Sequence, residues 1–216
     1  MFSWHYKEQK GDYSWYFKEL FNSPTLDYAK DVVLTPDPDN PNKFKQETTQ
    51  LVNIFESQNI FTEDSIVLDF GCGMGRVSKE MVERFKCKVI GFDFNDTMVQ
   101  FAKEYVPESE TFTAVNTYTT ENSVDICIAI LCLQHAEDPD KELKRIYSFL
   151  KPGGYFILLN ENARLVPVGV DNSGYPIWIE DHINVFELTE NVGFLKINTL
   201  PYMNSGKNVV FYQKPI

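Results

Sequence analysis

Apolar residues follow two alternating patterns along this chain, and each pattern predicts one kind of element. Short, nearly continuous apolar runs predict strands that are buried on both faces of a sheet. Segments with apolar residues three or four positions apart predict amphipathic helices between the strands. Strands that alternate with helices and end in a hairpin predict an α/β fold, a three-layer α/β/α sandwich. The expected strands are 66–70, 87–92, 111–115, 125–133, 155–159, 194–200 and 208–212, and the expected helices are 43–57, 77–85, 96–105, 140–150 and 185–192.

The first 50 residues do not share these patterns. Aromatic side chains are frequent up to Phe21, and the proline-rich stretch 35–41 cannot form a regular helix or an inner strand. We therefore expect residues 1–50 to form a lid or clasp that packs on a main domain, residues 51–216. Two interpretations stay open: the aromatic residues cover an apolar flank, or Tyr13, Trp15 and Tyr16 help to wall a substrate pocket.

Length and composition narrow the class of protein. The chain has 216 residues, enough for one domain with a small appendage. No apolar run is long enough to cross a bilayer, and the N-terminus lacks a basic region followed by an apolar one, so we expect neither a membrane segment nor a secretory signal. The cysteines form no C-x-x-C pair, which favours reduced thiols in a cytoplasmic protein.

The net charge of −11 argues against a nucleic-acid substrate. Proteins that bind DNA or RNA use lysine and arginine to neutralise phosphates. The longest basic cluster, 141–145, is interleaved with acids. Long nucleic acids are therefore disfavoured as partners.

Three glycines, Gly71, Gly73 and Gly75, follow the first predicted strand and precede a predicted helix. Glycine allows a sharp turn and a close approach of a ligand to the main chain. The free N–H groups at the start of the helix favour an anionic group. A dinucleotide fingerprint would need a glycine at position 76, where the chain has Arg76, so a nicotinamide-dependent enzyme is disfavoured.

The pattern D-x-G-x-G-x-G at 69–75 resembles the first motif of the class I S-adenosylmethionine (SAM)-dependent methyltransferases. Three more landmarks resemble this family and occur in its order: 91–95, 125–135 and the "LKPGG" turn at 150–154. The resemblance implies a mostly parallel seven-stranded sheet with a C-terminal antiparallel hairpin. It also implies SAM as the cofactor and S-adenosylhomocysteine as the product.

The resemblance implies a set of cofactor-binding residues at the carboxyl ends of the strands. Asp93 is expected to accept hydrogen bonds from the ribose hydroxyls, with a helix N-cap as its alternative role. Met98 is expected either to touch the adenine or to pack in the core. Asn116 stands where the family often has an acid. The complete set is Asp69, Gly71, Cys72, Gly73, Gly75, Asp93, Phe94, Met98, Asn116, Thr117 and Leu133.

Methyl transfer to a hydroxyl or an ammonium uses a base, and two histidines are candidates. His135 follows the fourth predicted strand, where a histidine can alternatively brace the loop by hydrogen bonding. His182 lies near Glu180 and Asp181 in a substrate-side insertion, 160–182. Gln134, Glu161, Tyr175 and Trp178 are expected to contact the acceptor. No set of residues has convincing metal-ligand spacing, so we predict no metal.

The favoured function is methyl transfer from SAM to O or N of a small-molecule metabolite. Methylation of a protein or tRNA, and a role as a non-catalytic SAM-binding partner subunit, are the alternatives. Partners are therefore a small-molecule acceptor and no membrane; whether the chain forms a homodimer stays open.

Overall fold

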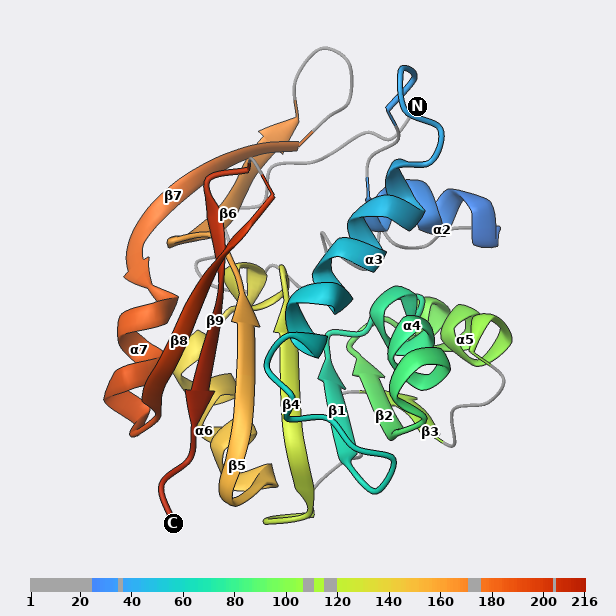
Figure 1. The fold of residues 1–216 in the computed structure, drawn as a ribbon. Helices are drawn as coiled ribbons and strands as arrows, with labels where there is room; N and C mark the ends of the chain where they lie inside the picture. Colours follow the sequence, from blue (N-terminus) through green and yellow to red (C-terminus); the bar gives the residue numbers. More distant parts are fainter. Residues whose placement is uncertain (1–24, 35–36, 107–110, 115–119, 171–175, 204) are drawn as a thin grey trace.

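The computed structural model describes residues 25–34, 37–106, 111–114, 120–170, 176–203 and 205–216 (Figure 1). Most of the expected lid, with Tyr13, Trp15 and Tyr16, lies outside these residues. In the described part of the chain, no helix is both long and apolar enough to cross a membrane. The cytoplasmic location stays a prediction.

The main sheet contains β1 (Ile66–Phe70), β2 (Lys88–Asp93), β3 (Thr111–Ala114), β4 (Val124–Ile130), β5 (Leu150–Leu159), β8 (Leu195–Tyr202) and β9 (Lys207–Gln213). These seven strands lie in the order β3-β2-β1-β4-β5-β9-β8. The strands from β3 to β5 in this order run parallel to one another. β9 is antiparallel to both β5 and β8. The mostly parallel sheet with a C-terminal antiparallel hairpin is therefore confirmed.

Helices cover both faces of this sheet. α3 (Lys43–Glu56) and α4 (Arg76–Phe85) pack on one face, and α6 (Pro139–Phe149) and α7 (Val185–Val192) pack on the other. α5 (Asp96–Tyr105) packs against β2 and β3. Each of the five predicted helices is present, with ends within one residue of the expected positions.

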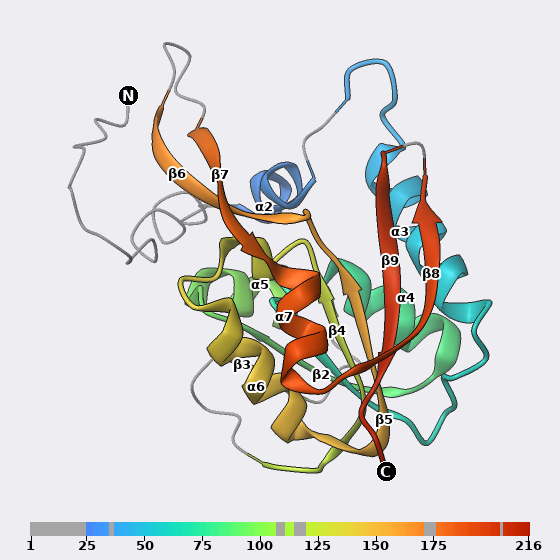
Figure 2. The ribbon, with the colours of Figure 1, turned by 90° about the vertical axis from the view of Figure 1, so that its left-hand side faces the viewer.

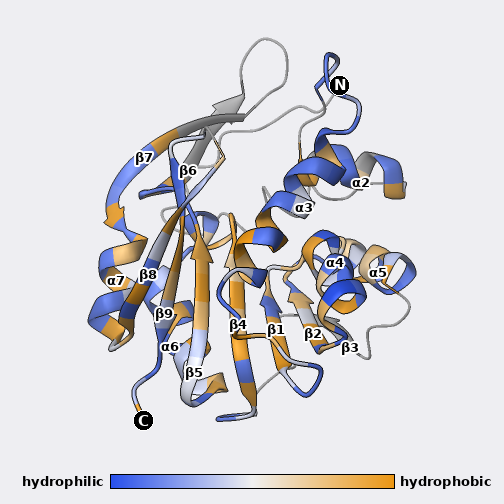
Figure 3. Cartoon of the chain, viewed as in Figure 1, coloured by the Kyte–Doolittle hydropathy of each residue, from blue (hydrophilic) through white to orange (hydrophobic). Residues whose placement is uncertain are grey.

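Neighbouring residues of the buried strands belong to different hydrophobic cores, one on each face of the sheet. Val67 packs with α3 and α4, whereas Leu68 packs with α6 and α7, because successive side chains of a strand point to opposite faces. Figure 3 shows the result: the central strands are mostly apolar along their length, whereas the helices are apolar on one side only. This pattern explains why continuous apolar runs identified the central strands.

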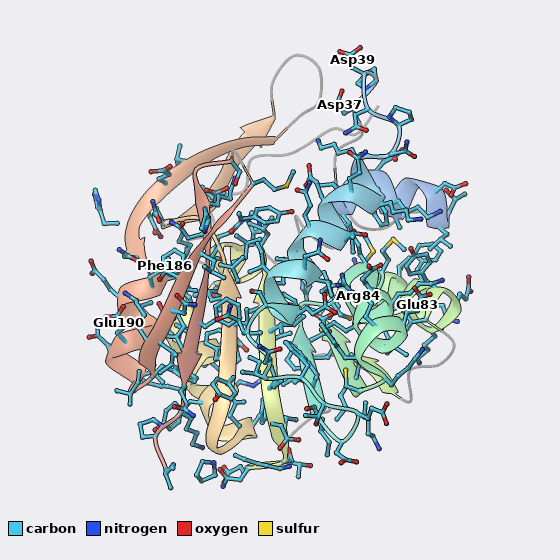
Figure 4. All side chains as sticks on the ribbon, viewed as in Figure 1. Asp37, Asp39, Glu83, Arg84, Phe186 and Glu190 are labelled. Carbon is cyan, nitrogen blue, oxygen red and sulfur yellow. The ribbon has the colours of Figure 1, made fainter. Side chains whose placement is uncertain are left out.

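A surface contact joins the two helices of the first face. Arg84 of α4, which Figure 4 labels, donates to Oδ1 of Asn53 in α3 at 2.8 Å and also pairs with Glu56. The contact is partly exposed and adds little to the stability that the buried side chains provide.

Two predicted strand boundaries are wrong by three residues or more, and one hairpin was not predicted. β4 ends at Ile130 rather than at residue 133, because Leu131 adopts a positive φ of 53° and a 3₁₀ turn, Leu133–His135, follows. β5 begins at Leu150, since the backbone of the "LKPGG" segment already belongs to the strand. The insertion forms an antiparallel hairpin of β6 (Ala163–Val170) and β7 (Pro176–Asn184), which the sequence did not predict.

Two additions lie beyond the carboxyl ends of the parallel strands. These are the hairpin β6–β7 and the helix α2 (Leu26–Val33), as the two views in Figures 1 and 2 show. α2 packs on α5 through Ala29, which is fully buried beside Met74 and Met98. Ligands of open parallel sheets bind at this end, so both additions frame the candidate site.

Candidate active site

The glycine turn is bonded to the end of the neighbouring strand. The N–H groups of Gly71 and Cys72 both donate to the carbonyl of Phe92 in β2, at 2.9 and 3.0 Å. Gly71 has a φ of +76°, and a Cβ at this position would lie 2.6 Å from Cβ of Cys132. Only glycine therefore lets the chain turn here against the segment that follows β4.

Asp93, the last residue of β2, is held by two backbone donors. Its Oδ2 accepts from N of Gly73 and its Oδ1 accepts from N of Asn95, each at 2.9 Å. The side chain of Asn95, not that of Asp93, caps α5, because Oδ1 of Asn95 accepts from Thr97 and Met98. Burial raises the pKa of Asp93 to about 6, although its backbone hydrogen bonds lower it.

A second buried carboxylate stands beneath the turn. Oγ of Ser78 donates to Oδ2 of Asp69 at 2.5 Å, which ties the end of β1 to the first turn of α4. Burial raises the pKa of Asp69 to about 6, and the hydrogen bond from Ser78 and the charge of Arg76 both lower it. Asp69 thus bonds to the helix that follows the turn, and its role in orienting the turn stays a prediction.

One cavity collects most of the expected cofactor residues. Asp69, Gly71, Cys72, Gly73, Asp93, Phe94, Met98 and the candidate base His135 all line it. Phe94 is 38% exposed and Met98 is 1% exposed, so the first presents its ring at the opening while the second packs into the wall. The strand ends and the first turns of α4 and α5 bring these residues together.

Two expected cofactor residues, Gly75 and Leu133, do not line this cavity. Gly75 sits at the N-cap of α4, where an added Cβ would lie 2.7 Å from Val106, so its absence of a side chain serves packing. Leu133 is buried in the core that α6 and α7 cover. Asn116 and Thr117 lie outside the described residues.

Sequence reasoning missed five residues that line the cavity: Val33, Arg76, Val77, Ile130 and Cys132. Arg76 and Val77 follow the glycine turn directly, and Ile130 and Cys132 flank the end of β4, so their positions next to a motif were the available signal. Val33 had no such signal, since it comes from the N-terminal segment and reaches the turn only through the placement of α2.

A polar network fixes the loop after β4. N of Gln134 donates to Oδ1 of Asn160 at 3.0 Å, and Oε1 of Gln134 accepts from N of Glu161 at 2.9 Å. Because Oε1 faces a backbone donor, Nε2 of Gln134 faces His135, whose Nε2 lies 3.2 Å away. An amide N–H only donates, so Nε2 of His135 accepts and the neutral ring carries its proton on Nδ1.

Burial also keeps the ring of His135 uncharged. It lowers the pKa of His135 to about 4, so the ring is neutral near pH 7. These contacts favour the bracing role of His135 over the role of a base, which stays a prediction.

The second candidate base stands apart. His182 is exposed on β7, and its neighbour Asp181 pairs with Nε of Arg164 at 3.1 Å instead. Arg164 is 9% exposed and also donates to the carbonyl of Glu137, so it anchors the hairpin to the loop after β4. His182 does not line the cavity.

The expected acceptor residues are only partly described. Oε1 of Glu161 pairs with Nζ of Lys207 at 3.0 Å, next to the network of Gln134. Tyr175 and the side chain of Trp178 lie outside the described residues. In the part of the chain that the structure describes, no three His, Cys, Asp or Glu side chains are grouped as metal ligands.

The sheet and the residues at the ends of its strands indicate a class of protein. A parallel sheet with an antiparallel terminal hairpin, a glycine turn after β1 and an acid at the end of β2 is the architecture of class I methyltransferases. Residues 68–158 match the family described as "Methyltransferase domain". Over this segment, which is less than half of the chain, the protein is similar to the class I SAM-dependent methyltransferases.

Two curated relatives each match less than half of this chain. The chain is 31% identical over 105 residues to phosphoethanolamine N-methyltransferase 2 of Caenorhabditis elegans, which covers 45% of this chain and 24% of the relative. It is 32% identical over 113 residues to the ubiquinone biosynthesis O-methyltransferase of Idiomarina loihiensis, which covers 48% of this chain and 46% of the relative. The chain thus spans less than half the length of these relatives.

Solved structures share the fold. Phosphoethanolamine N-methyltransferase 2 of Haemonchus contortus, in complex with phosphomonomethylethanolamine and S-adenosylhomocysteine, superimposes with a TM-score of 0.65. The identity is 18%, and the match covers 93% of this chain and 61% of that one. The [4+2]-cyclase SpnF gives a TM-score of 0.62 at 15% identity, over 77% of this chain and 80% of that one.

Proposed function

We propose that this protein transfers a methyl group from SAM to O or N of a small-molecule acceptor and releases S-adenosylhomocysteine. The observation that carries the proposal is that the glycine turn, Asp93 and the end of β4 meet in one cavity. The family match over 68–158 supports the cofactor, and the names of the relatives support a small acceptor.

The residues present fit SAM. Gly71 and Gly73 leave the main chain open to a ligand, and the two oxygens of Asp93 offer acceptors for a pair of ribose hydroxyls. Arg76, a buried cation, lines the same cavity. When bound, SAM supplies an electrophilic methyl group on a sulfonium, which a lone pair of the acceptor displaces in line.

The chain's own residues position the reactants and exclude water. His135 presents a neutral N–H at the end of β4, and the backbone of Glu161 holds Gln134, which in turn holds His135. We assign Gln134 and Glu161 to the acceptor side of the cavity. With Tyr175, Trp178 and His182 they make the insertion 160–182 the acceptor-recognition region.

The N-terminal segment, residues 1–50, completes the site as a lid on the domain 51–216. Val33 supports this assignment, because its Cγ2 lies 3.4 Å from the position that a Cβ on Gly73 would occupy. In this proposal Tyr13, Trp15 and Tyr16 extend the same cover over the acceptor.

Calorimetric titration tests the cofactor first. SAM, S-adenosylhomocysteine and NAD are titrated into the wild type and into Asp93→Ala. We expect the two adenosyl ligands to bind in the micromolar range, NAD not to bind, and Asp93→Ala to lose at least tenfold in affinity, because two charge-assisted hydrogen bonds are removed. Absence of binding to both adenosyl ligands would overturn the proposal.

An acceptor screen then separates the alternatives. The enzyme is incubated with SAM and either a small-metabolite library or macromolecules of a cell extract, and S-adenosylhomocysteine is quantified. Turnover with small molecules alone supports the proposal. Turnover with proteins or tRNA alone favours the second candidate, and tight SAM binding without turnover favours a non-catalytic partner subunit.

A further inference from the structure

Two buried carboxylates from neighbouring strands line the candidate site. Asp69 of β1 is 3% exposed and Asp93 of β2 is 7% exposed, and both belong to the same cavity. Burial is the main cause that raises the pKa of Asp69, Ser78 and Arg76 lower it, and the charge of Asp93 raises it again. The two carboxylates therefore act on each other electrostatically. With pKa values of about 6, both are mostly ionised near pH 7.

The other titratable groups that line the cavity only partly cancel this negative charge. Arg76, the first residue of α4, adds one positive charge, and its Nη1 donates to Oγ1 of Thr48 at 2.9 Å. The thiols of Cys72 and Cys132 are neutral, because burial raises their pKa values well above the usual range. His135 is neutral because burial lowers its pKa to about 4. The described residues of the cavity therefore carry a net negative charge.

The two adenosyl ligands of the proposed reaction differ by one charge. SAM carries a sulfonium cation, whereas S-adenosylhomocysteine carries a neutral thioether at the same position. Transfer of the methyl group breaks the C–S bond, leaves its electron pair on sulfur and moves the positive charge to the acceptor. A buried cavity of net negative charge stabilises the cation more than the product, because charges interact more strongly in a protein interior than in water.

We propose that Asp69 and Asp93 give the cavity a net negative charge that selects SAM over S-adenosylhomocysteine. The inference rests on the proposed function and goes beyond it, because it makes both carboxylates specificity-determining residues through their charge, whatever group of the ligand each one also contacts. The consequence for turnover is weak product inhibition, since methyl transfer removes the charge that the cavity attracts. Arg76 opposes the selection, so its removal should strengthen it.

The test compares three ligands by calorimetric titration at pH 7. These are SAM, S-adenosylhomocysteine and sinefungin, in which a carbon that bears an ammonium group replaces the methylated sulfur. We expect the wild type to bind SAM and sinefungin about threefold or more tightly than S-adenosylhomocysteine, and Asp69→Asn to lower both ratios by about threefold or more. Asparagine keeps the shape of the side chain and an acceptor for Ser78, and a ratio cancels any loss that affects all ligands alike.

Two further variants test the sign of the effect. Asp93→Asn should lower the ratio of SAM to S-adenosylhomocysteine affinity even if both affinities fall, whereas Arg76→Met should raise it by about twofold or more. Asp125→Asn is the matched control. Oδ2 of Asp125 accepts from N of Ile66 at the other end of β1, and Asp125 does not line the cavity, so its ratio should match the wild type.

The outcomes separate this inference from the proposed function. Ratios that stay constant in Asp69→Asn and Asp93→Asn, or that fall in Arg76→Met, would overturn the inference, as would a wild type that binds S-adenosylhomocysteine as tightly as SAM. Sinefungin that binds like S-adenosylhomocysteine would also overturn it, because the preference for SAM would then come from the methyl group rather than the charge. In each of these cases the proposed function stands. If the wild type bound none of the three ligands, the proposed function would fall as well.

Discussion

The amide of Gly73 donates a hydrogen bond of 2.9 Å to Oδ2 of Asp93, so the glycine turn after β1 and the acidic end of β2 form one unit. The same carboxylate accepts from Asn95, which caps α5. Asp93 therefore holds two ligand-facing segments together before any ligand arrives. This dual role means that its replacement affects both the stability of the fold and the shape of the site.

Asp93 should make the stability of the fold depend on pH. Burial raises its pKa from 3.8 to about 6, so the folded protein binds the proton more tightly than the unfolded chain does. Between about pH 4 and about pH 6 the folded state then holds more protons, and the contribution of Asp93 to the free energy of unfolding falls by about 2–3 kcal/mol as the pH rises. Urea unfolding of the wild type and Asp93→Asn across this range measures it.

The comparison with Asp93→Asn removes the contributions of the other buried groups. Asp69 and His135 titrate in both proteins, so the difference between the two unfolding free energies reports Asp93 together with its charge coupling to Asp69. We expect this difference to move against the wild type with rising pH. A difference that stays constant would show that Asp93 has an ordinary pKa in the folded state.

Gly71→Ala should destabilise the fold more than the same change at another positive-φ glycine. Gly71 and Gly206 have φ values of +76° and +75°, but only the former has a neighbour, Cβ of Cys132, at 2.6 Å from the added Cβ. Gly206→Ala should cost about 1–2 kcal/mol from backbone strain. Gly71→Ala should cost about 1–3 kcal/mol more because of the clash. Urea unfolding of the two variants tests this, and equal losses would contradict it.

Local signals made much of this site predictable. The apolar run 66–70, the glycines after it and the apolar run 87–92 each act within one element and its neighbours, so the sequence alone located the ends of β1 and β2 to within one residue. The order of the landmarks then implied the sheet. The residue types were therefore sufficient to predict contacts between elements that are consecutive in the chain.

Contacts between distant segments were not predictable. Val33 meets Gly73 only because α2 packs on α5 through Ala29, and no pattern near Val33 specifies this contact. The hairpin β6–β7 also escaped, since Pro167 and Gly169 interrupt the alternation that marks a strand. In the sequence, Arg76 was noticed only because it departs from the dinucleotide fingerprint. Its burial depends on contact with α3, which the residues around position 76 do not specify.

Ser78→Ala should weaken the support of Asp69. Oγ of Ser78 donates to Oδ2 of the buried Asp69, so its removal leaves this carboxylate one donor short. We expect a loss of about 1–3 kcal/mol near pH 7 and a smaller loss near pH 5, where Asp69 is protonated, because its pKa is about 6. Ser148→Ala is the control, since Ser148 donates only to the carbonyl of Arg145 in its own helix. Equal losses at the two pH values would contradict the role of the Asp69 charge.

The proton of His135 should reside on Nδ1, which is the less common position for a free imidazole. Gln134 imposes it, because Glu161 occupies Oε1 of Gln134 and leaves only Nε2 to face Nε2 of His135. ¹⁵N NMR of the imidazole rings reads the position of the proton directly. The chain has 3 histidines, and His135→Asn identifies the relevant signals. With a pKa of about 4, His135 should stay neutral and its signals should not move between about pH 5.5 and about pH 8.

Gln134→Leu should release Nε2 of His135 and shift the proton toward it. Titration of the His135 signals near neutral pH, or a proton on Nε2 in the wild type, would contradict this assignment and favour the role of His135 as a base over its bracing role.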